Sequence, residues 1–282
     1  MFARVPASSA NLGPGFDALA VALSLYVEVT LEEADSFSIT SEGCGAGLYD
    51  DERHLGARVA AAVLGHRNFA LHVTSSIPVS RGLGSSAALA LAAAAAAGAR
   101  NPLTVAAEVD GHAENAAASM LGGLVMASNG GARGVVARSM ALDEAWRFVV
   151  VIPEQELATA DARRVLPMSV PFADAVQNVQ SLGLLLAGLA DHRAFVEGSM
   201  EDRLHQPYRS PLLSFASPLL DVLVEGGAAG SCWSGAGSTM LALATISRAA
   251  MVADAGRGFL RAHGVAGTVH VLESDRRGLV TR

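Results

Sequence analysis

Residues 77–88 combine residue types that suit the binding of a phosphate group. They read IPVSRGLGSSAA and lie between a strand-like run and a long alanine-rich run that favours a helix. In that arrangement, backbone N–H groups and the N-terminus of a helix both point toward an anion. Gly82 and Gly84 allow a tight turn and close backbone approach, and the hydroxyls of Ser85 and Ser86 are able to ligate Mg²⁺. The segment therefore predicts a phosphate loop.

Two other interpretations of this segment remain open. A serine at the start of a helix is a common N-cap, so the run also fits a simple capped helix. Gly82, Gly84 and Ala87 fit the pattern G-x-G-x-x-A of a dinucleotide-binding turn, with Glu108 as the acid that would bind a ribose. Such a turn normally follows the first strand of a domain, whereas this one comes late and Pro78 interrupts its approach.

Arginine is the second residue type with clear chemical consequences. All 20 basic residues are Arg, and the sequence contains no Lys. The absence of lysine excludes a Walker A loop, a Schiff-base mechanism and a kinase built on a Lys–Glu pair. The simplest explanation of the bias is genomic composition. An arginine side chain presents a planar fork that suits a carboxylate.

The bulk composition limits the class of protein. A chain of 282 residues that is 51% hydrophobic forms one large domain or two modest ones. The net charge of −7 and the lack of a basic patch make nucleic acid a poor partner. Cys44 and Cys232 have no disulfide or metal spacing, which favours the reduced cytoplasm. No secretory signal is visible, and residues 83–99 predict a buried helix, not a membrane span.

The elements that position these residues follow from hydrophobic periodicity and from breakers. The pattern is mixed, without regular βαβ alternation, and so predicts the α+β class. A domain boundary is expected just before the buried run FVVVI, giving domains 1–146 and 147–282. Strands are expected at residues 26–31, 36–40, 70–74, 124–127, 148–152, 240–244 and 267–272, and helices at 55–64, 85–98, 103–115, 116–121, 172–190, 218–225 and 246–263.

Several blocks of the sequence resemble, in the same order, blocks of the homoserine kinases within the GHMP kinase superfamily. The glycine loop resembles the superfamily's phosphate loop, and the resemblance extends along almost the whole chain. The other blocks are VPASSANLGPGFDALAVAL (5–23), GHAENAAASMLGGL (111–124), RRVLP (163–167), DRLHQPYR (202–209) and SGAGS (234–238).

This resemblance implies an α+β, two-domain GHMP kinase fold. The N-terminal ATP-binding domain would be like ribosomal protein S5 domain 2, and the C-terminal domain would be ferredoxin-like. ATP would lie over the glycine loop with Mg²⁺ held by Ser86 and Glu108. Asp110 is a rival to Glu108, which could equally lie on a solvated helix face. The residues expected to bind ATP are Pro78, Val79, Ser80, Arg81, Gly82, Leu83, Gly84, Ser85, Ser86, Ala87 and Ala88.

The resemblance also implies the substrate, L-homoserine, between the two domains. The expected activity is phosphorylation of the homoserine hydroxyl by ATP in threonine biosynthesis, in the cytoplasm, by a homodimer. Asn11, Asp17 and Arg163 are the expected catalytic residues. The expected substrate-binding residues are Asn11, Asp17, His112, Glu114, Arg163, Arg209 and Gly235, with Arg164 a rival to Arg163 and His205 a further candidate contact.

Some positions depart from the family pattern. Glu114 stands where the family usually has Asp, while Ala113, Ala118 and Ser238 replace prolines. Asn115 stands where several sister kinases have an aspartate base, and Asn cannot act as a base. The alternatives left open are a GHMP kinase for another small alcohol, an inactive relative that binds nucleotide or amino acid as a sensor, and an oxidoreductase that binds a dinucleotide.

Overall fold

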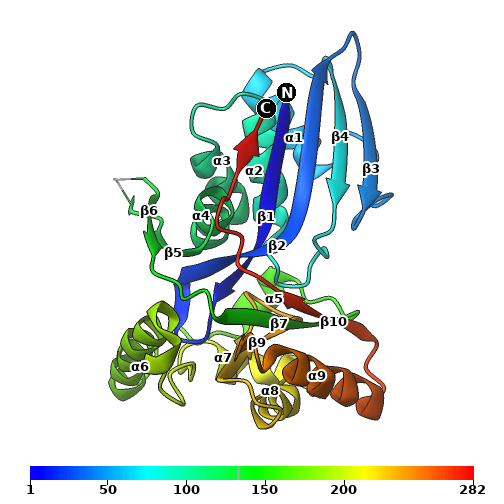
Figure 1. Cartoon of the computed structure of the whole chain (residues 1–282). Helices are drawn as coiled ribbons and strands as arrows, with labels where there is room; N and C mark the ends of the chain where they lie inside the picture. The colour runs from blue at the N-terminus through cyan, green and yellow to red at the C-terminus, as the bar shows by residue number, and fades with distance from the viewer. Residues whose placement is uncertain (132–133) are drawn as a thin grey trace.

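The computed structural model describes residues 1–131 and 134–282, which form two stacked bodies, each with its own sheet (Figure 1). The upper body contains a seven-stranded sheet, in which the path β11-β1-β2-β4-β3 is joined by β5 on β2 and β6 on β5. Only the pairing of β3 with β4 is parallel on this path. The strands are β1 (Phe2–Asn11), β2 (Gly15–Glu33), β3 (Ser38–Gly43), β4 (Phe69–Ser75), β5 (Leu124–Ser128), β6 (Val136–Met140) and β11 (Val280–Thr281).

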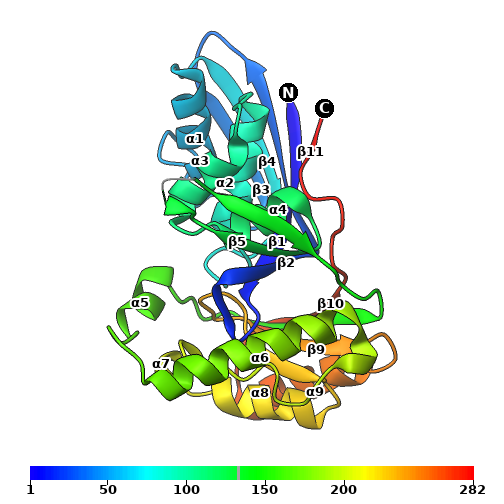
Figure 2. The same ribbon diagram turned by 90° about the vertical axis from the view of Figure 1, so that its left-hand side faces the viewer.

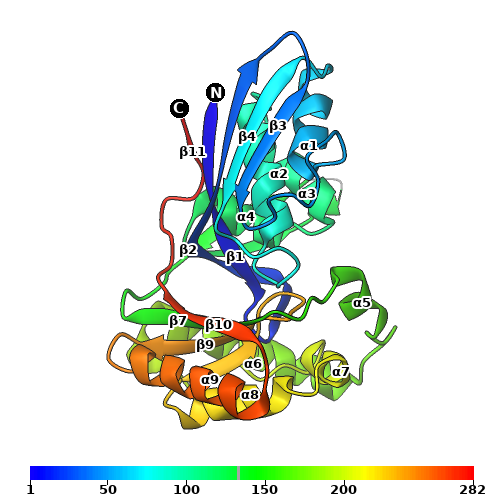
Figure 3. The same cartoon turned by 90° about the vertical axis from the view of Figure 1, so that its right-hand side faces the viewer.

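Four helices cover one face of the upper sheet (Figure 3). They are α1 (Leu55–Leu64), α2 (Ser85–Ala96), α3 (Pro102–Asp110) and α4 (Glu114–Leu121). Eight of the 12 residues of the central helix α2 are alanine, and most of its residues are buried. Alanine has the highest helix propensity and lets neighbouring elements approach closely, so α2 can lie in the middle of the core. The loop before α2 is thereby anchored to the core of this body.

The lower body has a four-stranded antiparallel sheet in the order β10-β7-β9-β8. Helices α8 and α9 pack beneath the sheet, and α6 runs along the side of this body (Figures 1 and 2). Its strands are β7 (Trp146–Pro153), β8 (Gly230–Trp233), β9 (Met240–Thr245) and β10 (Gly267–Leu272). Its helices are α5 (Thr159–Arg164), α6 (Phe172–Ala190), α7 (Gln206–Arg209), α8 (Ala216–Glu225) and α9 (Ala249–His263).

The chain crosses between the two bodies more than once. The expected boundary just before residue 147 falls at the start of β7, between the two sheets. After β10, however, the chain returns to the upper body, where β11 pairs with β1. The buried residues of β1 and β2 also pack in the same apolar cluster as Trp146, Phe148 and Leu241 of the lower sheet. The two bodies therefore share a continuous core.

The structure contains β6, β8, β11, α5 and α7, which were not expected, and it also differs from the expected elements in two further segments. Residues 2–23, which were not expected to form strands, make β1 and the first half of β2. The helix expected at 103–115 is divided, because Gly111 adopts a left-handed conformation that ends α3, and α4 begins at Glu114. The helices expected at 55–64 and 172–190 are confirmed. Within the described ranges, every helix is too short or too polar to cross a bilayer.

Candidate active site

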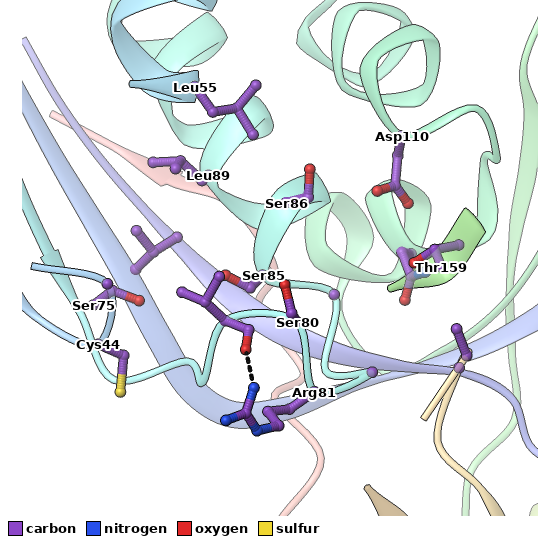
Figure 4. Close-up of a pocket in the computed structure, with 18 of the residues that line it drawn as sticks. Cys44, Leu55, Ser75, Ser80, Arg81, Ser85, Ser86, Leu89, Asp110 and Thr159 are labelled. Carbon is purple, nitrogen blue, oxygen red and sulfur yellow. Dashed lines mark hydrogen bonds between the residues drawn. The ribbon is translucent and has the colours of Figure 1, made fainter. Parts of the chain in front are cut away.

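One cleft collects residues from both bodies and from every sequence block described above. It has a volume of ≈ 360 Å³ and is lined by segments of β1, β2, β3, the glycine loop, α2, α5 and α7. Figure 4 shows the glycine loop crossing its centre, with Cys44, Leu55 and Leu89 on one side and Asp110 and Thr159 on the other. The cleft thus has an apolar end and a polar end, with the loop between them.

The glycine loop holds a conformation that only small residues permit. Gly82 has φ +74°, and a Cβ there would lie 2.1 Å from the carbonyl oxygen of Ser234. Gly84 has φ +65°, and its Cβ would lie 2.2 Å from Oγ of Ser8. The loop is therefore packed directly against β1 and the segment 234–238, and both glycines are required by close contact as well as by φ.

The N-terminus of α2 opens onto this loop without a cap. Gly84 occupies the N-cap position, and no side chain accepts a hydrogen bond from the first turn. The first intrahelical bond is donated by the amide of Ala88 to Gly84. The earlier amides of α2 are left for another acceptor, and a helix N-terminus favours an anion.

The residues expected to bind ATP divide into two groups. Those that line the cleft are Val79, Ser80, Arg81, Gly82, Gly84, Ser85 and Ser86, whereas Pro78, Leu83, Ala87 and Ala88 do not line it. Leu83, Ala87 and Ala88 are fully buried and anchor the loop to the core. Arg81 donates hydrogen bonds from Nε to Pro153 O at 2.9 Å and from Nη1 to Val79 O at 3.0 Å. Arg81 therefore holds the loop to the lower body.

The two acidic candidates for a metal ligand lie differently. Asp110 lines the cleft together with Ser86 (Figure 4). Glu108 is exposed on α3 and is not among the lining residues. Glu108 and Asp110 are two positions apart on the helix, which separates them by about 200° around its axis. Their carboxylates therefore point to opposite sides of α3. The geometry therefore favours Asp110 over Glu108, the reverse of the order expected from the sequence.

At the polar end of the cleft, Asn11 and Asp17 hold unusual backbone conformations. Their φ angles are 75° and 54°, in the left-handed region, with Leu12 between them at 47°. Oδ1 of Asn11 accepts a hydrogen bond from the amide of Asp17 at 3.0 Å. Its Nδ2 donates to the carbonyl oxygen of Gly235 at 2.9 Å. Strained conformations of this kind persist where the surrounding structure requires them, commonly at functional sites.

Arg163 and Asp17 form a two-pronged ion pair across the mouth of this end. Nη1 of Arg163 donates to Oδ2 of Asp17 at 3.1 Å, and Nη2 donates to Oδ1 at 2.5 Å. Nε of Arg163 is buried and has no partner within the described chain. Arg164, the rival candidate, is exposed and pairs with Asp161 on the same helix. Arg163 is therefore the arginine that α5 presents to the cleft.

Arg209 is a buried cation held from several sides. Its side chain is only 1% exposed, and burial lowers its pKa to about 10. Nε donates to Ala162 O at 3.2 Å, and Nη1 donates to Gly235 O at 3.0 Å. No described residue accepts a hydrogen bond from Nη2. Arg209 thus has one fixed edge and one N–H₂ group left for a ligand in the cleft.

His205 positions Arg209 and does not line the cleft itself. Its Nε2 lies 3.0 Å from Gly13 O, and its Nδ1 lies 3.1 Å from Nη1 of Arg209. Because an arginine can only donate, Nδ1 is the acceptor and the proton is on Nε2. Burial, and then the charge of Arg209, lower the pKa of His205 to about 4, against the opposing charge of Asp202. His205 is therefore neutral at physiological pH.

Glu114 is a buried carboxyl group with an unpartnered oxygen. It is 3% exposed at the start of α4, and its Oε2 has no hydrogen-bond partner within the described chain. Burial raises its pKa, and the nearby charge of Asp17 adds to this effect. His112, also in the cleft, lies 3.8 Å from Asp110, which raises the pKa of the imidazole above 6.5. A cationic ligand group would satisfy the free oxygen of Glu114.

Asn115 is fixed as a structural group. Its Oδ1 accepts a hydrogen bond from Oγ of Ser8 at 2.9 Å, next to Gly84. Asn115 therefore holds Ser8 beside the turn of the glycine loop.

Several lining or supporting residues were not expected from the sequence, and Phe16 and Thr159 are two of them at the polar end. Phe16 stacks on His205 at 4.9 Å and lies under the guanidinium groups of both Arg163 and Arg209, at 5.6 and 5.3 Å. A cation over an aromatic ring is stabilised by the electrons of the ring. Thr159, the first residue of α5, also lines the cleft. Phe16 lies inside the block at residues 5–23, and this block membership is the one signal that pointed to it.

Comparisons with known proteins agree with this geometry. A family model described as the GHMP kinases N terminal domain matches residues 53–123. The homoserine kinase of Desulfitobacterium hafniense is 36% identical over 290 residues, covering 98% of this chain and 97% of that protein. The homoserine kinase of Streptomyces avermitilis is 40% identical, covering 91% and 90%. The chain belongs to the homoserine kinase family.

Solved structures give the same result at the level of the fold. The homoserine kinase from Cytophaga hutchinsonii matches with a TM-score of 0.86 and 26% identity, covering 99% of this chain and 96% of that one. A mevalonate kinase matches with a TM-score of 0.68 at 13% identity, which is a likeness of fold alone. The expected α+β, two-domain GHMP kinase fold and the expected class of enzyme, an ATP-dependent kinase, are confirmed.

Proposed function

We propose that this protein transfers the γ-phosphoryl group of ATP to the side-chain hydroxyl of L-homoserine, forming O-phospho-L-homoserine for threonine biosynthesis. The full-length similarity to homoserine kinases supports this proposal. The observation that carries it is the charge pattern of the polar end. A buried carboxylate oxygen of Glu114 without a partner lies in the same cleft as the free N–H₂ group of Arg209. An amino acid carries the two opposite charges that would satisfy both.

The substrate contacts follow from the free groups. Nη2 of Arg209 would bind the substrate carboxylate. Arg163 would bind the same carboxylate if its ion pair with Asp17 opens or if its guanidinium group is shared between Asp17 and the substrate. Glu114 and Asp17 would bind the ammonium group. The carbonyl of Gly235 is already used by Asn11 and Arg209, so Gly235 positions these side chains. A neutral sugar or an isoprenoid alcohol gives no reason for this set of charges.

Catalysis would rest on positioning and on stabilisation of charge. The uncapped amides of α2 and the hydroxyls of the loop would hold the phosphates in line with the substrate hydroxyl. Asn11 and Asp17 would orient that hydroxyl. Because Asn115 is not a base, the hydroxyl proton would leave late in the reaction or pass to the phosphate.

Mg²⁺ is part of the proposal because the residues present fit it. Ser86 and Asp110 offer a hydroxyl and a carboxylate to the same cleft, and Mg²⁺ prefers oxygen ligands. When held by Ser86 and Asp110, the ion would supply positive charge that neutralises the phosphates. Glu108 is the alternative acidic ligand from the sequence, but its exposed position makes it the weaker candidate.

The first experiment measures ADP release with Mg²⁺ and ATP against homoserine, serine, threonine, mevalonate and galactose. Turnover that is strong with homoserine alone would support the proposal. The matched pair Arg209→Met and Arg164→Met then tests carboxylate recognition, since only the first arginine faces the cleft. Arg209→Met is expected to lower kcat/KM for homoserine by roughly 100-fold or more. Turnover with another alcohol would keep the kinase and overturn the substrate.

The assembly is proposed to be a homodimer formed through α6. One stripe of α6, with spacings of three and four, is apolar and exposed: Phe172, Val176, Val179, Gly183, Ala187 and Ala190. Phe172 and Val179 are 84% and 71% exposed. In an antiparallel pair of α6 helices, Phe172 would face Ala190 of the partner subunit, and Val179 would face its Gly183. Each large side chain then meets a small residue, which is the self-complementarity that a two-fold interface needs.

The cytoplasm is the proposed location. Cys44 and Cys232 are both free thiols, as expected in a reducing compartment, and the homoserine kinases that the chain resembles are biosynthetic enzymes.

A further inference from the structure

The apolar end of the cleft is the part that the proposed chemistry leaves without a role. It is lined by Cys44, Leu48, Tyr49, Leu55, Val73 and Leu89. With the phosphates of a nucleotide on the glycine loop and the acceptor substrate at the polar end, only the base of the nucleotide is left to fill this apolar end. Aliphatic and aromatic walls bind a flat base through its faces but do not tell one purine from another. Selection between purines requires polar groups aimed at the edge of the base.

His54 is the buried polar side chain at this end. It precedes α1, is 8% exposed and lines the cleft. Its Nδ1 accepts a hydrogen bond from the amide of Gly56 at 3.2 Å and so caps the helix. Atoms of its ring and Cδ1 of Leu89 each lie 3.3 Å from the position that a Cβ on Gly56 would take. The hydrogen bond from Gly56 therefore fixes the Nδ1 side of the ring.

The cap decides which nitrogen of His54 carries the proton. Because Nδ1 is the acceptor, the neutral ring must carry its hydrogen on Nε2. Burial lowers the pKa of His54 below 6.5, so this neutral form holds at pH 7. Throughout residues 1–131 and 134–282, no group is hydrogen bonded to Nε2. His54 thus offers its Nε2–H as a hydrogen-bond donor and has no free acceptor nitrogen.

A second unsatisfied polar atom lies in the same cleft. Oγ of Ser41, on β3, is buried and has no hydrogen-bond partner within the described ranges. A buried hydroxyl without a partner is costly, so a ligand that supplies a partner gains binding free energy there. A fixed N–H donor and a free hydroxyl therefore both line the cleft, together with the apolar side chains of this end and with Glu42 and Ser75.

We propose that His54 selects adenine over guanine by donating its Nε2–H to N1 of the purine ring, with Oγ of Ser41 accepting from the amino group at C6. Adenine presents an acceptor at N1 and a donor at C6. Guanine presents the reverse, a donor at N1 and an acceptor at C6, so its N1–H would meet the N–H of His54. Two buried donors facing each other are left unpaired, and such a mismatch discriminates strongly. The inference rests on the proposed function only in placing a nucleotide in this cleft.

The test measures direct binding of ATP, GTP and 1-deaza-ATP, without acceptor substrate, to the wild type and to His54→Ser. Serine is a good N-cap, so this variant keeps the acceptor for Gly56 but loses the ring donor. His66→Ser is the matched control, since His66 is exposed just after α1. The wild type is expected to bind ATP about 10-fold or more tighter than GTP or 1-deaza-ATP. His54→Ser should lose about that factor for ATP and change little for 1-deaza-ATP.

The outcomes separate the inference from the proposed function. Equal losses for all three nucleotides in His54→Ser, or a wild type that binds ATP and 1-deaza-ATP alike, would overturn the role of His54. A wild type that binds none of the nucleotides would overturn both. Selective ATP binding that depends on His54, without turnover of homoserine, would leave this inference standing and remove the proposed substrate. Unchanged thermal unfolding of His54→Ser would show that the cap is intact.

Discussion

The charged side chains at the polar end of the cleft are held in states that are costly without a ligand. Glu114 is buried with one unpartnered oxygen, and Arg209 is buried with one free N–H₂ group. An unpaired buried charge destabilises the fold, and removing one partner of a buried pair has large effects. The site therefore gives up some stability for a charge pattern that fits an amino acid.

Glu114→Gln should show directly that the charge at this position lowers stability and favours substrate binding. Because the pKa of Glu114 is raised above 4.5 in the folded state, its contribution to stability is lost as the pH rises through that raised pKa. The variant lacks this loss, so its unfolding free energy at pH 7.5 should be about 1–2 kcal/mol higher than that of the wild type. KM for homoserine should rise by roughly 10-fold or more, with KM for ATP unchanged.

Chemical denaturation and steady-state kinetics on the same preparations check both parts. A variant that is less stable and binds homoserine normally would contradict the assigned role.

His205 predicts an acid-sensitive link behind Arg209. The pKa of His205 is lowered from 6.5 to about 4, so its contribution to stability is complete above 6.5 and is lost as the pH falls toward 4. This difference corresponds to roughly 3 kcal/mol as an upper limit. Unfolding free energies measured from pH 7.5 to pH 4.5 should fall less steeply for His205→Gln than for the wild type. Parallel curves for the two proteins would show that protonation of His205 is not the cause.

Among the elements, the glycine loop is the most tightly constrained. The loop leads directly into α2 and packs against Ser8 of β1 and against the segment 234–238 of the lower body. Its geometry therefore depends on both bodies, although it lies entirely within the upper one.

Gly82→Ala is expected to disrupt nucleotide binding through this packing. The new Cβ would lie 2.1 Å from the carbonyl oxygen of Ser234, and the φ of +74° is unfavourable for alanine. We expect a loss of at least roughly 100-fold in kcat/KM for ATP. Gly98→Ala is the control, because Gly98 also has a positive φ of +78° but has open space around it. Similar losses of activity in both variants would mean that backbone strain alone is responsible.

The elements that the sequence predicted and those it missed differ in burial pattern. The helix at 172–190 has one buried face, and its periodicity predicted both ends correctly. The strand β1 is buried along nearly its whole length, so its residues do not alternate between apolar and polar. The family-like block at 5–23 concealed a strand pair because its Gly, Pro, Ser and Asn residues are typical of turns.

The sequence predicted some residues of the candidate site but not how their side chains are oriented. Residue type and block membership identified Asn11, Asp17 and Arg163, which the fold brings to one end of the cleft. The choice between Glu108 and Asp110 depends on which face of α3 meets the cleft, and that rotation is set by contacts distant in sequence. The tautomer of His205 depends on Gly13 and Arg209, which no local pattern reveals.

For the whole molecule, the proposed α6 interface predicts a dimer that one charge disrupts. Val179→Arg places a cation opposite Gly183 of the partner subunit, in an apolar contact, and should convert the dimer to a monomer. Val224→Arg on α8 is the matched control, since Val224 is also apolar and 40% exposed. Light scattering after gel filtration gives the mass of each variant. A wild-type monomer, or a Val179→Arg dimer, would rule out this interface.

The return of β11 to β1 has a consequence for how the chain reaches this structure. Ala3 pairs with Thr281, and the amide and carbonyl groups of Phe2 and Arg282 are hydrogen bonded to each other. The outer edge of the upper sheet is therefore made from residues at opposite ends of the sequence, while the whole lower body lies between them. Closing so long a loop is entropically slow, so β1 must wait as an unprotected edge until residues 280–282 arrive. During synthesis, the upper body would remain open to aggregation or to chaperones until the lower body has been made, and the phosphate loop would be completed only then.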